Sequence, residues 1–485
     1  MRDMVLILNF DAACSRALAR ALRAEQIYCK IVPGTISSRE AAEQEPLGLI
    51  LAGGDSGSIP EGLDPQLLDG RFPVLALGDT AAMLCRCLGG GALETVLCQG
   101  IGAVRFAPCP LTEGIDSCER MLRSVRRLRL PDCARVLASS RDETVGLMHG
   151  SLPLYGIQFS LETNDTDGMR LLLNFALNIC GCTRWWNFDV YIDRAVSELK
   201  RVVGDGIAVC AVTGGLSSGV TALLAQRALG DRVKCVFIDT GLMRRGEGDQ
   251  VMALYRDRLG LNLKRVQAQD RFLEALSGVA DPEQKRAAVH RVLQETINAE
   301  EAALRPYTVI LRSTTATDLM RGEDADRRPG LRGDAPTVEP LRELFKDEVR
   351  QVAERLGMPP EAARRQTFPG SGLALRILGA VSPARLQTLR AVEAIFSDEV
   401  SASGLDKRLN RYFAVLSPIP AQEERSVIVL RAVQAGEEAP QAYAARLPYD
   451  LLESICQRIL RERPEVQRVV YDLTPSSRRT GIEWQ

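Results

Sequence analysis

The chain has 485 residues, which is long enough for roughly two to four domains that each bury a core of their own. Its 61 lysines and arginines nearly balance its 62 aspartates and glutamates, so its charge gives no reason to expect a nucleic-acid partner or a membrane surface. No apolar run reaches the roughly 18 residues of a membrane span, and the first residues lack the layout of a signal peptide. We therefore expect a cytoplasmic protein.

Cysteine and histidine usage supports this expectation. The 13 cysteines are odd in number and scattered, which suits reduced thiols in a cytosol. Only two histidines occur, His149 and His290, which nearly excludes a histidine-rich metal centre and limits histidine acid–base chemistry. We predict no metal site built from the side chains of this chain.

The first third of the chain alternates apolar strands with helical patterns, which is the rhythm of a doubly wound parallel sheet. Strands are predicted at Val5–Asn9, Leu47–Ala52, Val74–Leu77 and Tyr155–Phe159, with helices that include Ser15–Ala24 and Gly168–Ile179. This rhythm breaks near Gly181, which predicts the end of a first domain at about residue 185.

A second α/β unit begins with a predicted helix at Tyr191–Val203. Its strands are expected at Ile207–Val212, Val233–Asp239, Leu263–Val266 and Thr308–Leu311. Residues 320–336 are rich in arginine, aspartate, glycine and proline and predict a loop. The last part of the chain predicts strands at Ser426–Val433 and Val466–Leu473 and a helix at Tyr449–Arg461. The predicted fold class is therefore α/β: two doubly wound parallel-sheet domains, 1–185 and 190–365, followed by a small α+β domain, 366–485.

A turn of small residues joins the predicted strand Ile207–Val212 to a helix. At such a turn backbone N–H groups converge, the helix dipole adds to them, and glycines allow a phosphate to come close. An ordinary strand-to-helix turn is the alternative that the spacing leaves open. The residues of this turn that form the predicted anion site are Thr213, Gly214, Gly215, Leu216, Ser217, Ser218 and Gly219.

The same turn resembles the SGGxDS pyrophosphate loop of ATP pyrophosphatases. Together with further segments in matching order, it resembles glutamine-hydrolysing GMP synthetases over essentially the whole chain. Those segments are Leu51–Ser58, Phe237–Arg244, Asp281–Arg286, Val338–Arg350, Phe368–Arg376, Ala445–Asp450 and Ile482–Trp484.

This resemblance implies a class I glutamine amidotransferase domain at 1–185, an ATP pyrophosphatase domain at 190–365 and a dimerisation domain at 366–485. The implied reaction is the ATP-dependent amination of xanthylate to GMP, with ATP and Mg²⁺ as cofactors and a homodimer as the assembly. It also implies that Asp239 lies near the adenine and ribose of ATP. The implied substrate-binding residues are Lys285, Arg286, Arg376 and Glu483.

The chain departs from the family pattern in the amidotransferase third. Gly78 stands where the family has its nucleophilic cysteine, and Ser160 stands where it has the partner histidine, so Glu162 is the only remnant of the catalytic triad. Cys85 and Cys87 lie in the helix that follows and are expected to be packed apolar residues. We predict that the chain does not hydrolyse glutamine.

The synthetase part departs from the pattern as well. Ser217 replaces the loop aspartate that the family places near Mg²⁺, which predicts weak metal binding, because Mg²⁺ prefers anionic oxygen. Three hypotheses stay open: an impaired GMP synthetase that uses free ammonia, a pseudoenzyme with a nucleotide-binding or regulatory role, and a repurposed adenylating enzyme. Five arginines would read a different anion in the third case or be solvated loop charges otherwise, namely Arg312, Arg328, Arg332, Arg478 and Arg479.

Overall fold

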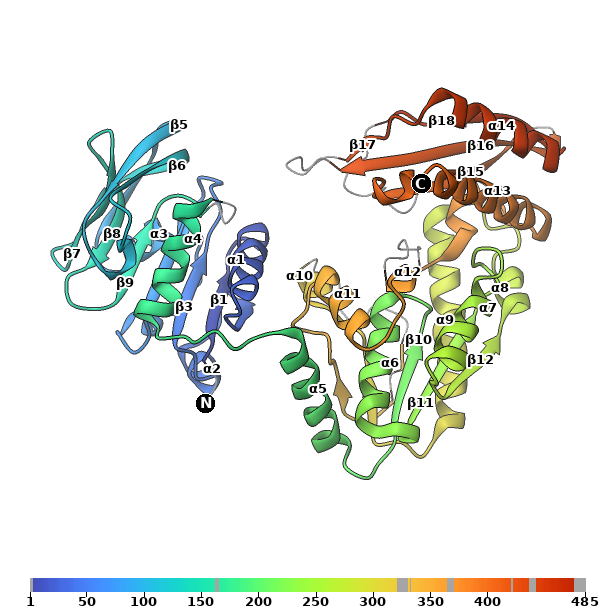
Figure 1. The fold of residues 1–485 in the computed structure, drawn as a ribbon, viewed down its shortest axis with the longest axis horizontal. Helices are drawn as coiled ribbons and strands as arrows, with labels where there is room; N and C mark the ends of the chain where they lie inside the picture. The colour runs from blue at the N-terminus through green and yellow to red at the C-terminus, as the bar shows by residue number, and fades with distance from the viewer. Residues whose placement is uncertain are drawn as a thin grey trace. The chain divides into compact units, whose positions relative to one another are not determined.

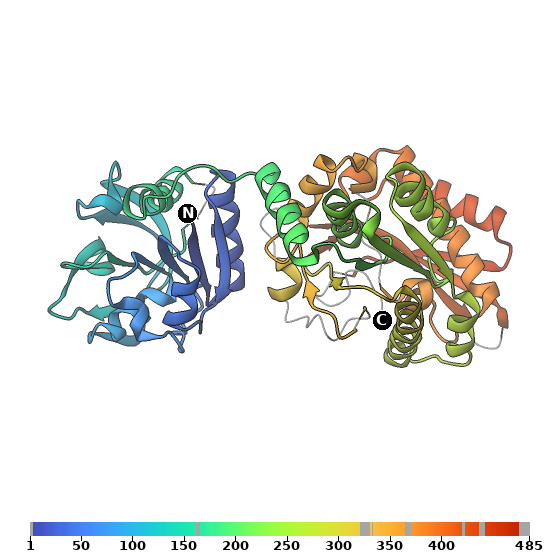
Figure 2. The ribbon, with the colours of Figure 1, turned by 90° about the horizontal axis from the view of Figure 1, so that it is seen from below.

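A computed structural model describes residues 3–161, 165–320, 330–331, 333–363, 370–419, 422–435 and 442–474. The chain divides into two compact units, Met1–Tyr191 and Ile192–Gln485, which are considered one at a time (Figure 1, Figure 2). The α/β fold class expected from the sequence is confirmed in both units. The expected division of the second unit near residue 365 stays a prediction.

One half of the nine-stranded sheet in the first unit is parallel, in the order β2-β1-β3-β4-β9. These strands are β1 (Val5–Asn9), β2 (Cys29–Pro33), β3 (Gly48–Ala52), β4 (Val74–Leu77) and β9 (Leu154–Ile157). β3 and β4 are buried along their whole length, which is why they read as continuous apolar runs in the sequence. The helices of this unit are α1 (Ala12–Ala24), α2 (Ser38–Glu43), α3 (Asp79–Cys87) and α4 (Thr166–Leu173), and α4 continues as a π-helical turn (Asn174–Ile179).

The other half of this sheet is antiparallel and continues it in the order β8-β7-β5-β6. These strands are β5 (Gly91–Phe106), β6 (Ser117–Arg129), β7 (Ala134–Ser140) and β8 (Glu143–His149). These four strands are not among those expected from the sequence. Five arginines interrupt the apolar alternation of β6, so its pattern is weak although its pairing with β5 is long.

The second unit contains a parallel five-stranded sheet in the order β12-β11-β10-β13-β14. Its strands are β10 (Ala208–Val212), β11 (Val233–Asp239), β12 (Leu263–Gln267), β13 (Val309–Leu311) and β14 (Thr337–Val338). The strand order reverses between β10 and β13, and such a switch point is where open α/β sheets usually bind ligands. The loop that follows β10 is therefore well placed to bind a ligand.

Most helices of this unit connect or flank these strands (Figure 1). They are α5 (Phe188–Val203), which crosses the boundary between the units, α6 (Leu216–Leu229), α7 (Glu247–Met252), α8 (Gln269–Ala275), α9 (Pro282–Leu304), α10 (Ala316–Met320), α11 (Lys346–Arg355) and α12 (Pro360–Ala363). No helix among the described residues is both long enough and apolar enough to cross a membrane.

A smaller sheet near the C-terminus has β16 at its centre. It comprises β15 (Arg411–Ile419), β16 (Gln422–Ala435), β17 (Ala442–Ala444) and β18 (Val466–Tyr471), and only β18 runs parallel to β16. Helices α13 (Pro383–Ala402) and α14 (Tyr449–Glu462) pack on one of its faces. One continuous apolar core joins this face to the five-stranded sheet, through residues that include Phe272, Val289, Leu373, Phe396, Ile428 and Ile455.

Lys285 links α9 to the segment that leads into the smaller sheet. Its side chain is fully buried, and its ammonium group donates hydrogen bonds to the carbonyl oxygens of Ala374 (3.3 Å) and Ile377 (2.6 Å). Burial, and to a smaller extent the positive charge of Arg385, lower the pKa of Lys285 to about 8, while Asp281 opposes the shift.

We expect the contribution of Lys285 to the free energy of unfolding to rise with pH above 8. Between about pH 8 and its ordinary pKa of 10.5, the folded chain has lost the Lys285 proton while the unfolded chain still holds it. The slope from this one group is at most about 1.4 kcal/mol per pH unit. Urea unfolding of wild type and Lys285→Met at pH 7, 8, 9 and 10 measures it, as the difference between the two proteins.

Lys264→Met is the control, because Lys264 lies on the surface and pairs with Glu300 at 2.6 Å. Between pH 8 and pH 10 the Lys285 difference should rise more steeply than the Lys264 difference. A Lys285 difference that is flat or falls above pH 8 would contradict the assignment.

Candidate functional site

A sharp strand-to-helix turn joins β4 to α3 at Gly78. Its dihedral angles, φ 62° and ψ −134°, are those of a strained elbow of the kind that carries a nucleophile in many hydrolases. A Cβ atom at this position would lie 2.5 Å from the carbonyl oxygen of Gly54 and 2.7 Å from that of Gly53. The backbone of the 53–54 loop therefore occupies the space that a side chain at the elbow would need.

The same loop is hydrogen-bonded to the residue after the elbow. The backbone N–H of Asp79, which in such elbows helps to bind an oxyanion, donates to Gly54 O at 2.9 Å. The Asp79 carboxylate accepts from Ser56 Oγ (2.9 Å) and from the Gly57 N–H (3.1 Å). This elbow is thus closed by contacts within the protein.

Ser160, expected at the position of the family's histidine, lies near the carboxyl of Asp55. Burial raises the pKa of the Asp55 carboxyl and the charge of Asp79 raises it further, whereas Ser160 and Arg123 oppose the shift. Glu162, the expected remnant of the triad, lies outside the described residues.

The two cysteines of α3 are placed differently from each other. Cys85 is buried, and its thiol faces the carbonyl oxygens of Gly91 (3.7 Å) and Arg129 (3.6 Å). Cys87 is exposed. Desolvation raises the pKa of both thiols, which disfavours the reactive thiolate.

The loop between β10 and α6 has the geometry of an anion site. Gly214 has a positive φ of 76°, and the N-cap residue Gly215 provides no side-chain cap to the 14-residue helix α6. The N–H groups of the first turn are therefore left without a side-chain partner, at the end of the helix where the dipole favours anions.

Hydrogen bonds inside this loop hold its shape. Ser218 Oγ accepts from the Thr213 N–H and donates to Gly215 O, both at 3.1 Å. A Cβ atom at Gly219 would lie 2.1 Å from the hydroxyl of Tyr255, so glycine is needed there for packing. Ser218 and Gly219 are buried, and the exposed or half-buried part of the loop consists of Thr213, Gly214, Gly215, Leu216 and Ser217.

The loop offers hydroxyl and backbone N–H groups but no carboxylate, since serine stands at position 217. Within the part of the chain that the structure describes, no group of three or more histidine, cysteine, aspartate or glutamate side chains could hold a metal ion. These residues do not fit a Mg²⁺ site formed by the protein itself.

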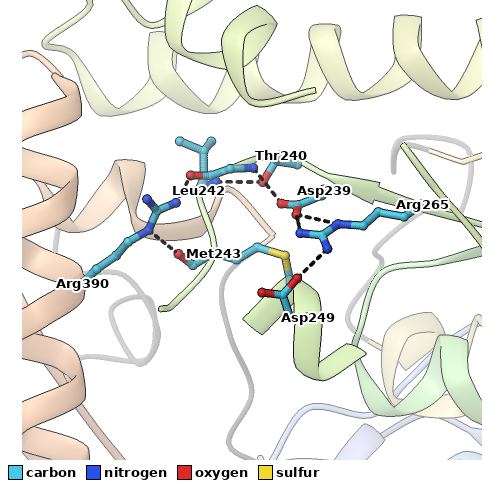
Figure 3. A network of polar contacts seen from close by, with 8 residues as sticks. Asp239, Thr240, Leu242, Met243, Asp249, Arg265 and Arg390 are labelled. Atoms are coloured by element: carbon cyan, nitrogen blue, oxygen red, sulfur yellow. Dashed lines mark hydrogen bonds and ion pairs between the residues drawn. The ribbon is translucent and has the colours of Figure 1, made fainter. Parts of the chain in front are cut away.

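Asp239, expected near the adenine and ribose, lies at the end of β11 and binds within the protein through both carboxylate oxygens (Figure 3). Oδ1 accepts from the Gly241 N–H at 3.0 Å, and Oδ2 accepts from Arg265 Nε at 3.1 Å and also from its Nη2. Arg265 also donates to Asp249 Oδ1 at 2.6 Å, and the two carboxylates, Asp249 first, raise the pKa of the guanidinium. No local sequence pattern pointed to Arg265, because its contact with Asp239 depends on the pairing of β11 with β12.

Of the four expected substrate-binding residues, the three that the structure describes are not brought together in one exposed site. Lys285 is buried, with its ammonium group bonded to the carbonyl oxygens of Ala374 and Ile377. Arg376 is 2% exposed and donates to Glu393 Oε1 at 2.9 Å. Arg286 is partly exposed and pairs with Glu283, and Glu483 lies outside the described residues. Their role in substrate binding stays a prediction.

Comparison with known proteins finds relatives that align with the whole chain. Residues 398–484 match the family model described as the GMP synthase C terminal domain. The glutamine-hydrolysing GMP synthase of Symbiobacterium thermophilum is 36% identical over 512 aligned residues, covering 100% of this chain and 99% of the relative. The enzymes of the same name from Clostridium perfringens and Thermosynechococcus vestitus are each 34% identical and again align with the whole of this chain, over 100% and 97% of their own lengths. At this identity over its full length, the chain belongs to the glutamine-hydrolysing GMP synthase family.

Proposed function

We propose that this family member does not hydrolyse glutamine, and that its synthetase half binds ATP and aminates xanthylate slowly with free ammonia. The observation that carries the proposal is Gly78, a residue without a side chain, on an elbow whose side-chain space is filled by the 53–54 loop. Attack on the glutamine amide needs a nucleophile and a base to activate it. Gly78 supplies no nucleophile, and the Ser160 hydroxyl cannot take up a proton as an imidazole does.

The case for ATP binding rests on the β10–α6 loop. Backbone donors at an uncapped helix N-terminus attract the phosphates of a nucleotide without the help of a side chain. In the proposed reaction an oxygen of xanthylate attacks the α-phosphate of ATP, pyrophosphate leaves, and ammonia then displaces AMP. The loop would hold the departing pyrophosphate during the first step.

A nucleotide-binding pseudoenzyme is the second candidate. Two observations favour it: Ser217 removes a carboxylate from the phosphate loop, and the carboxylate of Asp239 is bound by Arg265. The serine at position 217 affects synthesis more strongly than nucleotide binding by backbone N–H groups, and Arg265 takes up the carboxylate that the resemblance places near the adenine and ribose.

We also propose that the chain forms a homodimer through residues 366–485. Large apolar side chains lie exposed in this part of the chain, including Val470 (44% exposed) and Leu473 (73% exposed). A symmetric dimer would bury the same patch on both copies.

An amination assay with xanthylate, ATP and Mg²⁺, run separately with glutamine and with ammonium, tests the proposed activity. We expect no glutamate release and no GMP above background with glutamine, at least roughly 10⁴-fold below an intact relative, because nucleophile and base are both missing. Slow GMP formation is expected with ammonium. Glutamine-dependent GMP formation would contradict the proposal, and ATP binding without any GMP would favour the pseudoenzyme.

The double variant Gly78→Cys with Ser160→His gives this assay a second arm. It should remain inactive with glutamine, because the new Cβ atom would lie 2.5 Å from Gly54 O and the Asp79 N–H is already bonded to the same oxygen. Full recovery of glutamine hydrolysis would show that the loop does not close the elbow.

ATP binding to the phosphate loop should be weak, with a Kd of about 1 mM, and should depend little on Mg²⁺. Ser217→Asp should weaken binding without Mg²⁺, since its carboxylate repels the phosphates, and should strengthen it when Mg²⁺ is present. Ser217→Asn is the neutral control of similar size. Calorimetry with and without Mg²⁺ measures the effect, and a wild type with strong Mg²⁺ dependence would refute the prediction.

Light scattering of the purified chain at micromolar concentration tests the assembly. We expect twice the chain mass of 53.1 kDa. Leu473→Lys, which replaces an exposed apolar side chain with a charged one, should shift the mass toward that of one chain. A wild type that stays at the mass of one chain would refute the dimer.

A further inference from the structure

The loop that follows Asp239, residues 240–246, connects β11 to α7. Its N–H groups find partners close by in the sequence. The N–H of Gly241 donates to Asp239 Oδ1 (3.0 Å), that of Leu242 to Thr240 Oγ1 (3.2 Å) and that of Arg244 to Glu247 Oε2 (2.9 Å). These bonds tie the loop to its own ends.

The carbonyl groups of this loop are bound differently. Three successive carbonyl oxygens, at positions 241–243, all accept hydrogen bonds from residues beyond 370. Arg390 on α13 donates through Nε to Met243 O at 3.0 Å and through Nη2 to Gly241 O (Figure 3). Between them, Leu242 O accepts from the Leu373 N–H at 2.8 Å. A distant segment of the chain therefore sets the course of the loop.

The approach of this distant segment is close enough to require glycine. Gly372 has a φ of 65°, and a Cβ atom there would lie 2.5 Å from Leu242 O. Any other residue at this position would be strained by the positive φ, and its Cβ atom would clash with Leu242 O unless the backbone moved.

A second connection runs beside the first. Nε of Arg244, which belongs to the loop, lies 3.7 Å from Oε2 of Glu393. Glu393 is on α13, the same helix as Arg390. Glu393 is itself held by Arg376 (2.9 Å) and by the Ala414 N–H (2.7 Å). Since Glu393 is 6% exposed, these contacts are sheltered from solvent, where charged hydrogen bonds contribute most.

We infer that Arg390 is a positioning residue that holds the 240–246 loop, and with it Asp239, in the arrangement that receives the nucleotide. The part of this inference that concerns nucleotide binding rests on the proposed ATP site. One guanidinium spans two carbonyls of the loop, so its loss frees both at once, whereas a single-point donor can replace only one. The order of the loop and the binding of ATP are then linked, because any ligand that needs the ordered loop must supply the ordering free energy that Arg390 otherwise provides.

Four variants of the full-length chain test this. Arg390→Ala removes both hydrogen bonds, and Arg390→Lys keeps the charge but has one ammonium for two acceptors. Gly372→Ala disturbs the Leu373–Leu242 contact without altering any charge. Arg385→Ala is the matched control, because Arg385 lies on the same helix and donates to Ala380 O at 2.8 Å, which is not part of the loop.

Hydrogen exchange of peptides covering 240–247 in the ligand-free protein and calorimetry with ATP are the two measurements, with Tm recorded for each variant. We expect Arg390→Ala to speed exchange in these peptides and to weaken ATP binding about tenfold or more. Arg390→Lys should recover part of both effects. Arg385→Ala should lower Tm by a similar amount, yet leave loop exchange unchanged and ATP affinity within about twofold.

The results separate a positioning role of Arg390 from a role in packing alone. If Arg390→Ala and Arg385→Ala change Tm alike and neither alters exchange at 240–247, Arg390 serves packing alone and the inference is wrong. If wild type does not bind ATP, the proposed function fails, while the exchange data still show whether Arg390 orders the loop. If Arg390→Ala does not fold, unchanged loop exchange in both Arg390→Lys and Gly372→Ala overturns the inference.

Discussion

Backbone N–H and C=O groups at the carboxyl ends of parallel strands need hydrogen-bond partners, and the partner that each group finds decides what the strand end can do. At the end of β4 the Asp79 N–H is bonded to Gly54 O, so the elbow is closed. At the end of β10 the first turn of α6 has no side-chain cap, so its donors suit an anionic ligand. At the end of β11 Arg390 and Leu373 bind the loop carbonyls. All three are carboxyl ends of parallel strands. The first is closed, the second can bind an anion, and the third is held by a distant segment of the chain.

The closed elbow depends on a contact between two segments that are separate in the sequence, Gly78 and the 53–54 loop. The absence of a side chain at Gly78 allows the Gly53 and Gly54 carbonyls to approach, and their approach then excludes any side chain from that position. The elbow backbone keeps its strained dihedral angles even so. The geometry of a nucleophile elbow is thus set by the β4–α3 connection, whereas its chemistry depends on side chains and free donors.

Buried and half-buried cations connect the parts of the second unit. Lys285, Arg376 and Arg390 each reach carbonyl or carboxylate oxygens on another element, and burial lowers the pKa of all three. A buried cation is tolerated only where oxygen atoms replace its lost water, so each fixes the position of the backbone that surrounds it. Lys285 and Arg376, which the family resemblance assigns to substrate binding, therefore hold helices and loops together.

The sequence by itself determined the buried parallel strands, such as Val5–Asn9, Val74–Leu77 and Val233–Asp239, because strands covered on both faces are mostly apolar. It also determined the small-residue turn at 213–219 and the absence of a side-chain nucleophile at Gly78 and of an imidazole at Ser160, since these follow from residue type alone. Only the tertiary structure decided the antiparallel strands β5–β8, whose arginines hide their alternation, and the pairing of Asp239 with Arg265. The Arg390 contacts likewise join positions about 150 residues apart, and hydrogen bonds over such separations depend on how the sheets and helices pack, which no local pattern of residues encodes.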